Sequence, residues 1–336
     1  MRFWRSSILK APLAGAAALA ALLAVTATPA AAQTTWIMAS GYPESNFLTQ
    51  DLRMFVADVE KATGGKLKIT LHSNDSLIKL DGIKRAVQTG QIQAGEIRQG
   101  VYGNEDPMNI LDGVPFVAST YPEAWKLMEA QAPYFDKTYG KAGMKILGYQ
   151  VWPSQGFYTK GPINSPDDFK GKKLRIYSTA TQRMGTLLGF QATILPFAEI
   201  PQAFSTGLIE ALFTSAQTGV DIQAWDNTKY FTNVGAILSK NALIVNARAF
   251  NALPKDEQAA LIAAGAAYTK RSWEMSEKSH KEEAAILIAH GMQVVEAPPS
   301  VVAVMKKVGL QMAEEWKASA SPEAVASLDT YLKASK

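Results

Sequence analysis

The chain has 336 residues, with 34 Lys and Arg, 30 Asp and Glu, three His and no Cys, and 47% of its residues are hydrophobic. This composition is typical of a globular protein long enough for two domains, and it excludes a disordered chain or a small disulfide scaffold. The absence of cysteine excludes disulfides, thiolate metal sites, iron–sulfur clusters and a cysteine nucleophile. The three histidines have no short ligand spacing, so the sequence predicts no histidine metal site.

The start of the chain has the pattern of a secretory signal peptide. Three basic residues precede an apolar run over residues 11–25, and a stretch of small residues ends at Ala32. The run is shorter than the about 20 residues that a membrane-spanning helix needs. We therefore expect cleavage after Ala32 and a soluble periplasmic product that is not embedded in a membrane. Cleavage removes the three basic residues and lowers the formal net charge from +4 to +1, so a nucleic-acid partner is not expected.

Helix-like and strand-like segments alternate along the rest of the chain, which favours an α/β fold with crossover connections. Polar and apolar residues alternate, or apolar residues run together, in four segments that predict strands: 66–71, 92–97, 144–151 and 173–177. Apolar residues at helical spacing predict helices over residues 46–62, 82–89, 122–139, 180–188 and 199–206.

Two further segments predict how the chain divides into domains. Pro and Gly cluster between residues 152 and 168, where we expect the chain to cross into a second domain. The helical pattern runs without interruption from Pro254 to His290, a length of about 54 Å, so we expect this helix to brace both domains. The predicted bounds are a signal peptide over 1–32, domain I over 33–152 plus 241–280, and domain II over 153–240 plus 281–336.

The sequence contains none of the common catalytic motifs, such as G-x-S-x-G, H-E-x-x-H, a phosphate-binding loop or G-x-G-x-x-G. Asp167 and Asp168 follow Ser165 and Pro166 at a predicted turn. We interpret their carboxylates as acceptors for free backbone N–H groups at this turn, rather than as a catalytic acid–base pair. We therefore predict no catalytic residue, no metal ligand and no cofactor.

Several stretches in a fixed order resemble one family of proteins. Residues 165–176 read SPDDFKGKKLRI and residues 194–207 read ILPFAEIPQAFSTG, and shorter matches lie at 63–69, 87–92, 114–116, 143–148 and 243–246. Together they resemble the solute-binding proteins of TRAP transporters, the tripartite ATP-independent periplasmic carriers, over essentially the whole mature chain. The resemblance implies two α/β domains hinged around a cleft, as in class II periplasmic binding proteins, and a ligand that carries a carboxylate.

Arg175 matches the family's ligand-binding arginine. A guanidinium group can hold a carboxylate through two parallel charge-assisted hydrogen bonds. In a strand over residues 173–177, Leu174 and Ile176 face one way and Arg175 the other, so Arg175 can reach a cleft while its neighbours pack.

Other positions depart from the family pattern. Gln155 stands where many members have a second arginine, and Arg98 stands where an acidic or polar residue is usual. Two alternatives stay open for Arg98: it joins Arg175 around a dicarboxylate, or it forms an ion pair with Glu96 or Asp106 and never touches ligand.

Aromatic residues are dense around these positions, and Phe213 replaces a residue that is acidic in the family. This replacement makes the expected cleft more apolar and favours a carboxylate with a hydrophobic or aromatic body, although packing in the core is the alternative for any one aromatic side chain. The expected ligand contacts are Arg175, Arg98, Gln155, Thr214, Phe197, Phe213, Trp152, Tyr42, Asn46 and Ser40.

The resemblance implies the periplasmic component of a TRAP transporter, which captures an organic acid and delivers it to membrane permease subunits. Two alternatives remain. One is an exported enzyme of unknown reaction on a similar two-domain scaffold, which turnover of a bound acid would reveal. The other is a sensor partner that presents the solute to a membrane receptor.

Overall fold

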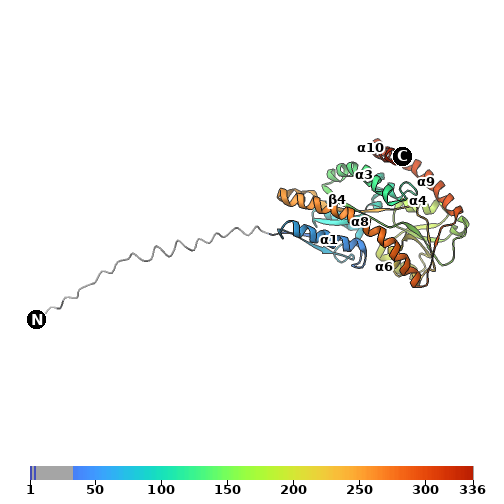
Figure 1. Cartoon of the computed structure of the whole chain (residues 1–336), viewed down its shortest axis with the longest axis horizontal. Coiled ribbons are helices and arrows are strands. Elements are labelled where there is room, and N and C mark those ends of the chain that lie inside the picture. Colours follow the sequence, from blue (N-terminus) through green and yellow to red (C-terminus); the bar gives the residue numbers. More distant parts are fainter. Residues whose placement is uncertain (2–3, 5–32, 336) are drawn as a thin grey trace. The chain divides into compact units, whose positions relative to one another are not determined.

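The computed structural model describes residues 33–335 together with Met1 and Trp4. Apart from these two residues, the predicted signal peptide lies outside the described residues, up to and including Ala32 at the expected cleavage site. Residues Thr34–Lys336 form one compact unit, which contains two β-sheets with helices on both faces (Figure 1). No helix of the described part combines the length and the apolar character needed to cross a bilayer.

The first sheet has five strands in the order β2-β1-β3-β10-β4. β1, β2 and β3 pair in parallel, whereas β10 runs antiparallel to both β3 and β4. All seven residues of β10 are buried, as expected for a strand with neighbours on both sides and helices on both faces. The bounds are Thr34–Ala39 for β1, Leu67–His72 for β2, Ala94–Arg98 for β3, Met144–Val151 for β4 and Lys240–Asn246 for β10.

The second sheet has six strands in the order β11-β9-β5-β8-β6-β7. β5 runs antiparallel to its neighbours β8 and β9, and the other pairs are parallel. The bounds are Gln155–Thr159 for β5, Lys173–Ile176 for β6, Gln191–Ile194 for β7, Ala211–Ser215 for β8, Tyr230–Asn233 for β9 and Gln293–Glu296 for β11. We call the first sheet with its helices the first lobe and the second sheet with its helices the second lobe.

The chain crosses between the sheets three times, from β4 to β5, from β9 to β10 and, through residues 247–292, from β10 to β11. The first crossing begins at Trp152, inside the segment 152–168 where a crossing into a second domain was expected. Residues 155–159 of this segment form a fully buried strand of the second sheet. Gly156 fits there because a Cβ at this position would lie 2.2 Å from the backbone oxygen of Thr232. Gly156, which the sequence analysis assigned to a linker, therefore allows two strands to lie close together.

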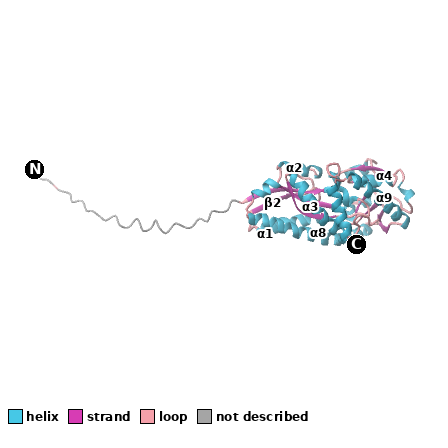
Figure 2. Ribbon diagram, turned by 90° about the horizontal axis from the view of Figure 1, so that it is seen from above, coloured by secondary structure: helices cyan, strands magenta, loops and turns pink. Residues whose placement is uncertain are grey.

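Helices cover both faces of each sheet (Figure 2). In the first lobe, α1 and the first half of α8 cover one face, and α2 and α3 cover the other. In the second lobe, α4 and α9 cover one face, and α5, α6 and the end of α8 cover the other. The bounds are Phe47–Ala62 for α1, Ile83–Thr89 for α2, Tyr121–Lys141 for α3, Thr179–Leu187 for α4, Ile200–Ser205 for α5, Ala216–Asp221 for α6, Ala247–Ala252 for α7, Lys255–Ala289 for α8, Pro299–Ser319 for α9 and Pro322–Ala334 for α10.

The predicted long helix is confirmed as α8, which has 35 residues and runs across the unit (orange in Figure 1). Leu261, Ala264 and Tyr268 in its first half pack in a core of the first lobe, and Leu287 near its end packs in a core of the second. The α/β fold class is likewise confirmed. Element bounds from the sequence agree with the structure to within about two residues for α1, α2, α3, α4, β2, β3, β4 and β6.

The C-terminal helices also join the lobes. α9 packs on α4 of the second lobe, whereas α10 packs on α3 of the first, with Leu328 and Tyr331 buried there. The domain bounds stay a prediction, and this packing argues for placing residues 322–334 with the first lobe.

Candidate functional site

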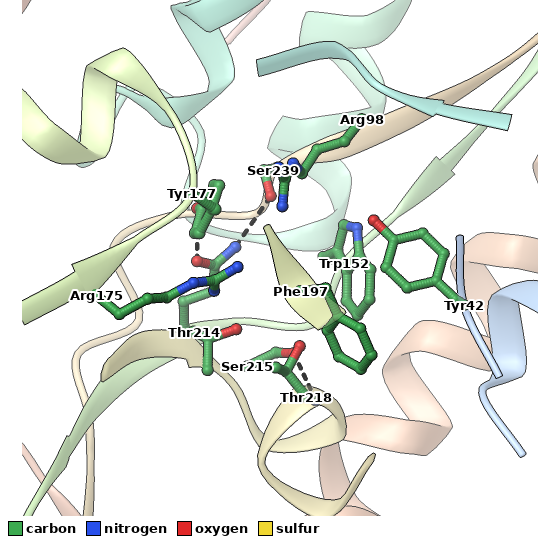
Figure 3. Close-up of a pocket in the computed structure, with 11 residues that line it drawn as sticks. Tyr42, Arg98, Trp152, Arg175, Tyr177, Phe197, Thr214, Ser215, Thr218 and Ser239 are labelled. Carbon is green, nitrogen blue, oxygen red and sulfur yellow. Dashed lines mark hydrogen bonds between the residues drawn. The ribbon is translucent and has the colours of Figure 1, made fainter. Parts of the chain in front are cut away.

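A cavity of about 330 Å³ of empty space, including its mouth, lies between the two lobes (Figure 3). The first lobe contributes residues from the loop after β1, from the end of β3 and from the first crossing. The second lobe contributes residues from β5, β6 and β8 and from the segments after β6, β7 and β8, and the second crossing contributes one serine. The lining consists of Tyr42, Arg98, Trp152, Gln155, Arg175, Tyr177, Phe197, Thr214, Ser215, Thr218 and Ser239.

Arg175 projects from β6 into this cavity. Its strand neighbours Leu174 and Ile176 are fully buried in the core on the other face of the sheet, as the alternation predicted. Its Nε and Nη2 donate to the backbone oxygen of Leu195 at 3.1 and 2.9 Å. Burial, together with the positive charge of Arg98, lowers the pKa of Arg175 to about 9. The cavity therefore holds a cation whose charge is disfavoured until an anion arrives.

Arg98 ends β3 and lies in the wall opposite. Its Nη2 lies 3.4 Å from Oδ1 of Asp81, and its buried Nε has no hydrogen-bond partner among the described residues. Among the described residues, Arg98 forms its ion pair with Asp81, whereas Glu96 and Asp106, the two partners expected as alternatives, bond to other groups. The buried Nε of Arg98 can still donate to a bound molecule.

Gln155, the position where an arginine is usual in the family, lies between two hydroxyl groups. Its Oε1 accepts from the hydroxyl of Tyr177 at 2.6 Å, and its Nε2 donates to Oγ of Ser239 at 3.0 Å. The amide group is therefore held in one orientation, and its two hydrogen bonds join β5 to the residue after β6 and to the second crossing.

Three aromatic rings form the apolar side of the cavity. The ring of Tyr42 meets the rings of Trp152 and Phe197 edge to face, with centroids 5.1 and 5.7 Å apart. Nε1 of Trp152 donates to Oδ1 of Asn241 at 3.0 Å, which fixes the plane of the indole. These rings form an apolar wall across the cavity from Arg175 (Figure 3).

A buried carboxyl group lies behind this wall. Glu96 on β3 accepts from Oγ of Ser40 at 2.5 Å and from Nδ2 of Asn241 at 2.7 Å. Burial raises the pKa of Glu96 to about 7. Because Asn241 also holds Trp152, Glu96 fixes the aromatic wall indirectly.

Hydroxyl groups supply the remaining polar surface. Thr214 lies on β8, and Ser215 ends that strand and caps α6 by accepting from the backbone N–H of Thr218 at 3.3 Å. The three hydroxyls lie on the Arg175 side of the cavity (Figure 3). They can donate to or accept from a polar ligand.

The structure places seven of the ten predicted residues at the cavity and three elsewhere. Phe213 points into the core of the second lobe against Phe157, with ring centroids 4.9 Å apart, because it is one residue out of phase with Thr214 on the strand. Asn46 caps α1 and donates to Oδ2 of Asp221 at 2.7 Å. Ser40 is fully buried and bonded to Glu96. Whether the seven touch ligand stays a prediction.

Sequence reasoning missed four lining residues: Tyr177, Ser215, Thr218 and Ser239. A signal existed for Tyr177, because it is two residues after Arg175 and so shares its face of the strand. Ser215 and Thr218 have the spacing of an N-cap residue and its partner at the start of a helix. The helix starts where the preceding strand ends, and that strand end lies at the cavity. Nothing in the sequence indicated Ser239.

The chain matches the family model described as bacterial extracellular solute-binding protein, family 7, over residues 38–320. Its fold is similar to that of the Bordetella pertussis receptor DctP7, described as binding pyroglutamic acid. The TM-score is 0.87, with 38% identity, 89% of this chain and 99% of that chain covered. A marine metagenome TRAP solute-binding protein described as specific for pyroglutamate gives a TM-score of 0.87, with 33% identity, and 90% and 99% of the two chains covered.

A solute-binding protein of Albidiferax ferrireducens is 25% identical over 280 residues, which are 82% of each chain. The resemblance drawn from ordered sequence stretches is thereby confirmed, as is membership of a family of solute-binding receptors. With a two-lobed α/β fold, a cavity between the lobes and this match over most of its length, the chain belongs to the bacterial extracellular solute-binding proteins of family 7, the TRAP solute-binding proteins.

Proposed function

We propose that this protein captures pyroglutamate, or a close relative that combines one carboxylate with a small lactam ring. The observation that supports this most is Arg175, a buried guanidinium group that faces a cavity opposite an aromatic wall. Receptors that are 38% and 33% identical over nearly the whole chain are described as binding pyroglutamic acid, which supports the same ligand.

The chemistry of the lining matches the parts of this molecule. We assign the carboxylate to Arg175, because a guanidinium group presents two parallel donors to it. We assign the lactam carbonyl to Arg98, whose Nε is otherwise without a partner among the described residues. The apolar ring edge then packs on Trp152 and Phe197, and Thr214 accepts from the lactam N–H.

The proposal contains no chemical step. Closure of the two lobes around the acid removes water from its hydrogen bonds and strengthens them, and release reverses the closure. We propose further that the mature chain begins at Gln33, acts in the periplasm and delivers the acid to the permease subunits of a TRAP transporter. An exported enzyme and a solute-presenting sensor remain the alternatives, and recovery of chemically altered acid after incubation would favour the enzyme.

Isothermal titration calorimetry of residues 33–336, after unfolding and refolding to remove copurified ligand, tests the proposal. Pyroglutamate should bind with a one-to-one stoichiometry and raise the melting temperature. The methyl ester, which lacks the negative charge, and proline, which lacks the lactam oxygen, should each bind at least about tenfold more weakly. Equal binding of the ester would contradict the role of Arg175, and absence of pyroglutamate binding to folded protein would contradict the proposed ligand.

A further inference from the structure

The charged side chains around the cavity set the net charge that a bound acid meets. Among the described residues that line it, the charged side chains are Arg98 and Arg175. The guanidinium carbons of these arginines lie 6.0 and 5.9 Å from the centroid of the Tyr177 ring, so both act on the same small space (Figure 3). On their own they would give the cavity two positive charges.

Asp81 supplies one compensating negative charge from outside the cavity. Its Oδ1 lies 3.4 Å from Nη2 of Arg98, and 49% of its side-chain surface is exposed to solvent. It lines a neighbouring hollow that shares Tyr177 with the first cavity. Asp81 therefore partly neutralises Arg98 without occupying space that a bound acid needs.

The loop before Asp81 fixes its position. Oδ1 of Asp75 accepts from the backbone N–H of Leu80 at 2.8 Å, and Leu80 is buried. Gly41 allows this packing, because a Cβ there would lie 2.7 Å from Cβ of Leu80. The carboxylate of Asp81 is thus held beside Arg98 by a packed turn.

We infer that Asp81 is a specificity-determining residue, which limits this receptor to monocarboxylates by neutralising one of the two cavity arginines. This inference rests on the proposed capture of a carboxylate at Arg175. With Asp81 present, the two arginines and one aspartate leave one positive charge, which a monoanion balances. A dianion would bring a second negative charge toward a guanidinium group that already has a carboxylate beside it.

Glu96 is the other acidic residue on this face of β3, two residues before Arg98. Its oxygens face Ser40 and Asn241 instead of a guanidinium group, and burial raises its pKa to about 7. Glu96 therefore contributes less than a full negative charge near neutral pH and is not the ion partner of Arg98.

The test compares Asp81→Asn with the wild type by calorimetry against pyroglutamate and against glutarate, a dianion of similar length. The variant keeps the size of the side chain and removes its charge. We expect the ratio of the two dissociation constants to move toward glutarate by about tenfold at low salt, and by less at high salt because Asp81 is half exposed. Asp329→Asn, which removes a negative charge from an exposed position on α10, is the matched control and should leave the ratio unchanged.

A second variant shows whether the effect acts through Arg98. In an Arg98→Gln background, Asp81→Asn should no longer change the ratio, since the charge that it releases is absent. The inference is overturned if Asp81→Asn weakens both acids equally, which is a structural effect, or if it leaves the ratio unchanged, or if the wild type already prefers glutarate. If wild-type protein binds another monocarboxylate instead of pyroglutamate, the proposed ligand fails while the same ratio, measured with that acid and its dicarboxylate analogue, still decides the role of Asp81.

Discussion

Arg175 combines two features that rarely occur together, full burial and the lack of an ion-pair partner among the described residues. Its hydrogen bonds to the oxygen of Leu195 orient the guanidinium group but do not balance its charge. The nearby charge of Arg98 adds repulsion. The ligand-free site is therefore electrostatically unfavourable, and part of the free energy of anion binding comes from relieving this repulsion.

Arg175→Met should separate binding from stability. We expect pyroglutamate to bind at least about 30-fold more weakly, because the carboxylate would lose its charged partner inside a buried site. The melting temperature of the ligand-free protein should not fall, since the change removes a buried cation. Calorimetry and thermal unfolding check both points, with Arg183→Met, an exposed arginine on α4, as the control. A large fall in ligand-free stability would contradict this view of the site.

Glu96→Gln should alter the dependence of stability on pH. The pKa of Glu96 is raised by burial from 4.5 to about 7, so its ionised form is disfavoured in the folded state. Its contribution to wild-type stability is therefore most favourable below the unfolded pKa and is lost as the pH rises through about 7. Relative to the wild type, Glu96→Gln should gain about 3 kcal/mol of unfolding free energy between about pH 5 and about pH 8.

Urea unfolding at a series of pH values measures this difference. Burial also raises the pKa of Asp51 and of Asp221 to about 6 and that of Glu283 to about 7. The contributions of Asp221 and Glu283 cancel in the comparison, whereas that of Asp51, whose charge also raises the pKa of Glu96, cancels only in part. Glu96 is hydrogen-bonded to Asn241, which in turn is hydrogen-bonded to Trp152. We therefore also expect the tryptophan emission of the variant to differ from that of the wild type. A difference that does not change with pH would show that Glu96 does not titrate in this range.

The sequence predicted the site residues that strand alternation and local motifs determine, and it failed where three-dimensional contacts decide. Arg175 follows from alternation and from a recognisable stretch. The same alternation excludes Phe213 once Thr214 is placed at the cavity, because adjacent strand residues face opposite ways. Ser40 and Asn46 were expected at the ligand because they lie near Tyr42 in the sequence. Their buried partners, Glu96 and Asp221, are distant in the chain, and no local pattern indicates them.

At the scale of elements, the contact between α8 and β4 fixes the helix that joins the lobes. Gly265 makes this contact close, since a Cβ there would lie 2.2 Å from the backbone oxygen of Leu147. A side chain of any size would push the helix away from the sheet. The contact also holds Thr269, whose hydroxyl accepts from the backbone N–H of Tyr149 at 3.0 Å.

Gly265→Ala should lower the free energy of unfolding by about 1–3 kcal/mol, because the added methyl group meets backbone that cannot move aside. Gly140→Ala in α3 is the matched control. Its added methyl group meets nothing within 4 Å, and the higher helix propensity of alanine should stabilise the protein by about 0.5 kcal/mol. Urea unfolding of both variants measures the contrast, and equal effects of the two substitutions would contradict the close approach.

Elements with a strong period were predictable, and elements inside a breaker-rich segment were not. The helix over residues 255–289 has no side-chain cap at its N-terminus, yet the uninterrupted helical pattern between Pro254 and Gly291 was sufficient to predict it. β5 was missed because Pro153, Gly156, Gly161 and Pro162 indicate a linker, whereas the pairing of Gly156 with β9 is a tertiary effect. In a central strand such as β5, contacts with the neighbouring strands outweigh the local sequence preference for a linker.

At the scale of the whole molecule, one hydrogen bond links the lobes directly beside the cavity. Nδ2 of Asn46, at the start of α1, donates to Oδ2 of Asp221, at the end of α6, over 2.7 Å. Oδ1 of Asn46 meanwhile caps α1 by accepting from the backbone N–H of Leu48 at 2.9 Å. The side chain thus ties a helix of the first lobe to a helix of the second.

Asn46→Ser should keep the cap and lose the link between the lobes, because serine is a good N-cap residue but is too short to reach Asp221. We expect the ligand to dissociate about tenfold faster, the effect of losing a hydrogen bond to a charged group. Stopped-flow dissociation measures the rate, and small-angle scattering of the ligand-free protein should show a larger radius of gyration. Asn164→Ser, on an exposed loop of the second lobe, is the control, and an unchanged rate in Asn46→Ser would contradict the role of the link.

The place of β10 in the first sheet has a consequence for folding kinetics. β10 lies between β3 and β4, yet it follows β4 in the chain only after five of the six strands of the second sheet, β5 to β9. A nascent chain therefore cannot complete its first lobe until residue 246 has emerged, and α8, which covers that sheet, follows later still. Contacts of such large sequence separation slow folding, so most of the polypeptide is synthesised before any stable native lobe exists. We therefore expect this chain to remain unfolded for longer during synthesis than a chain in which each lobe is one continuous segment.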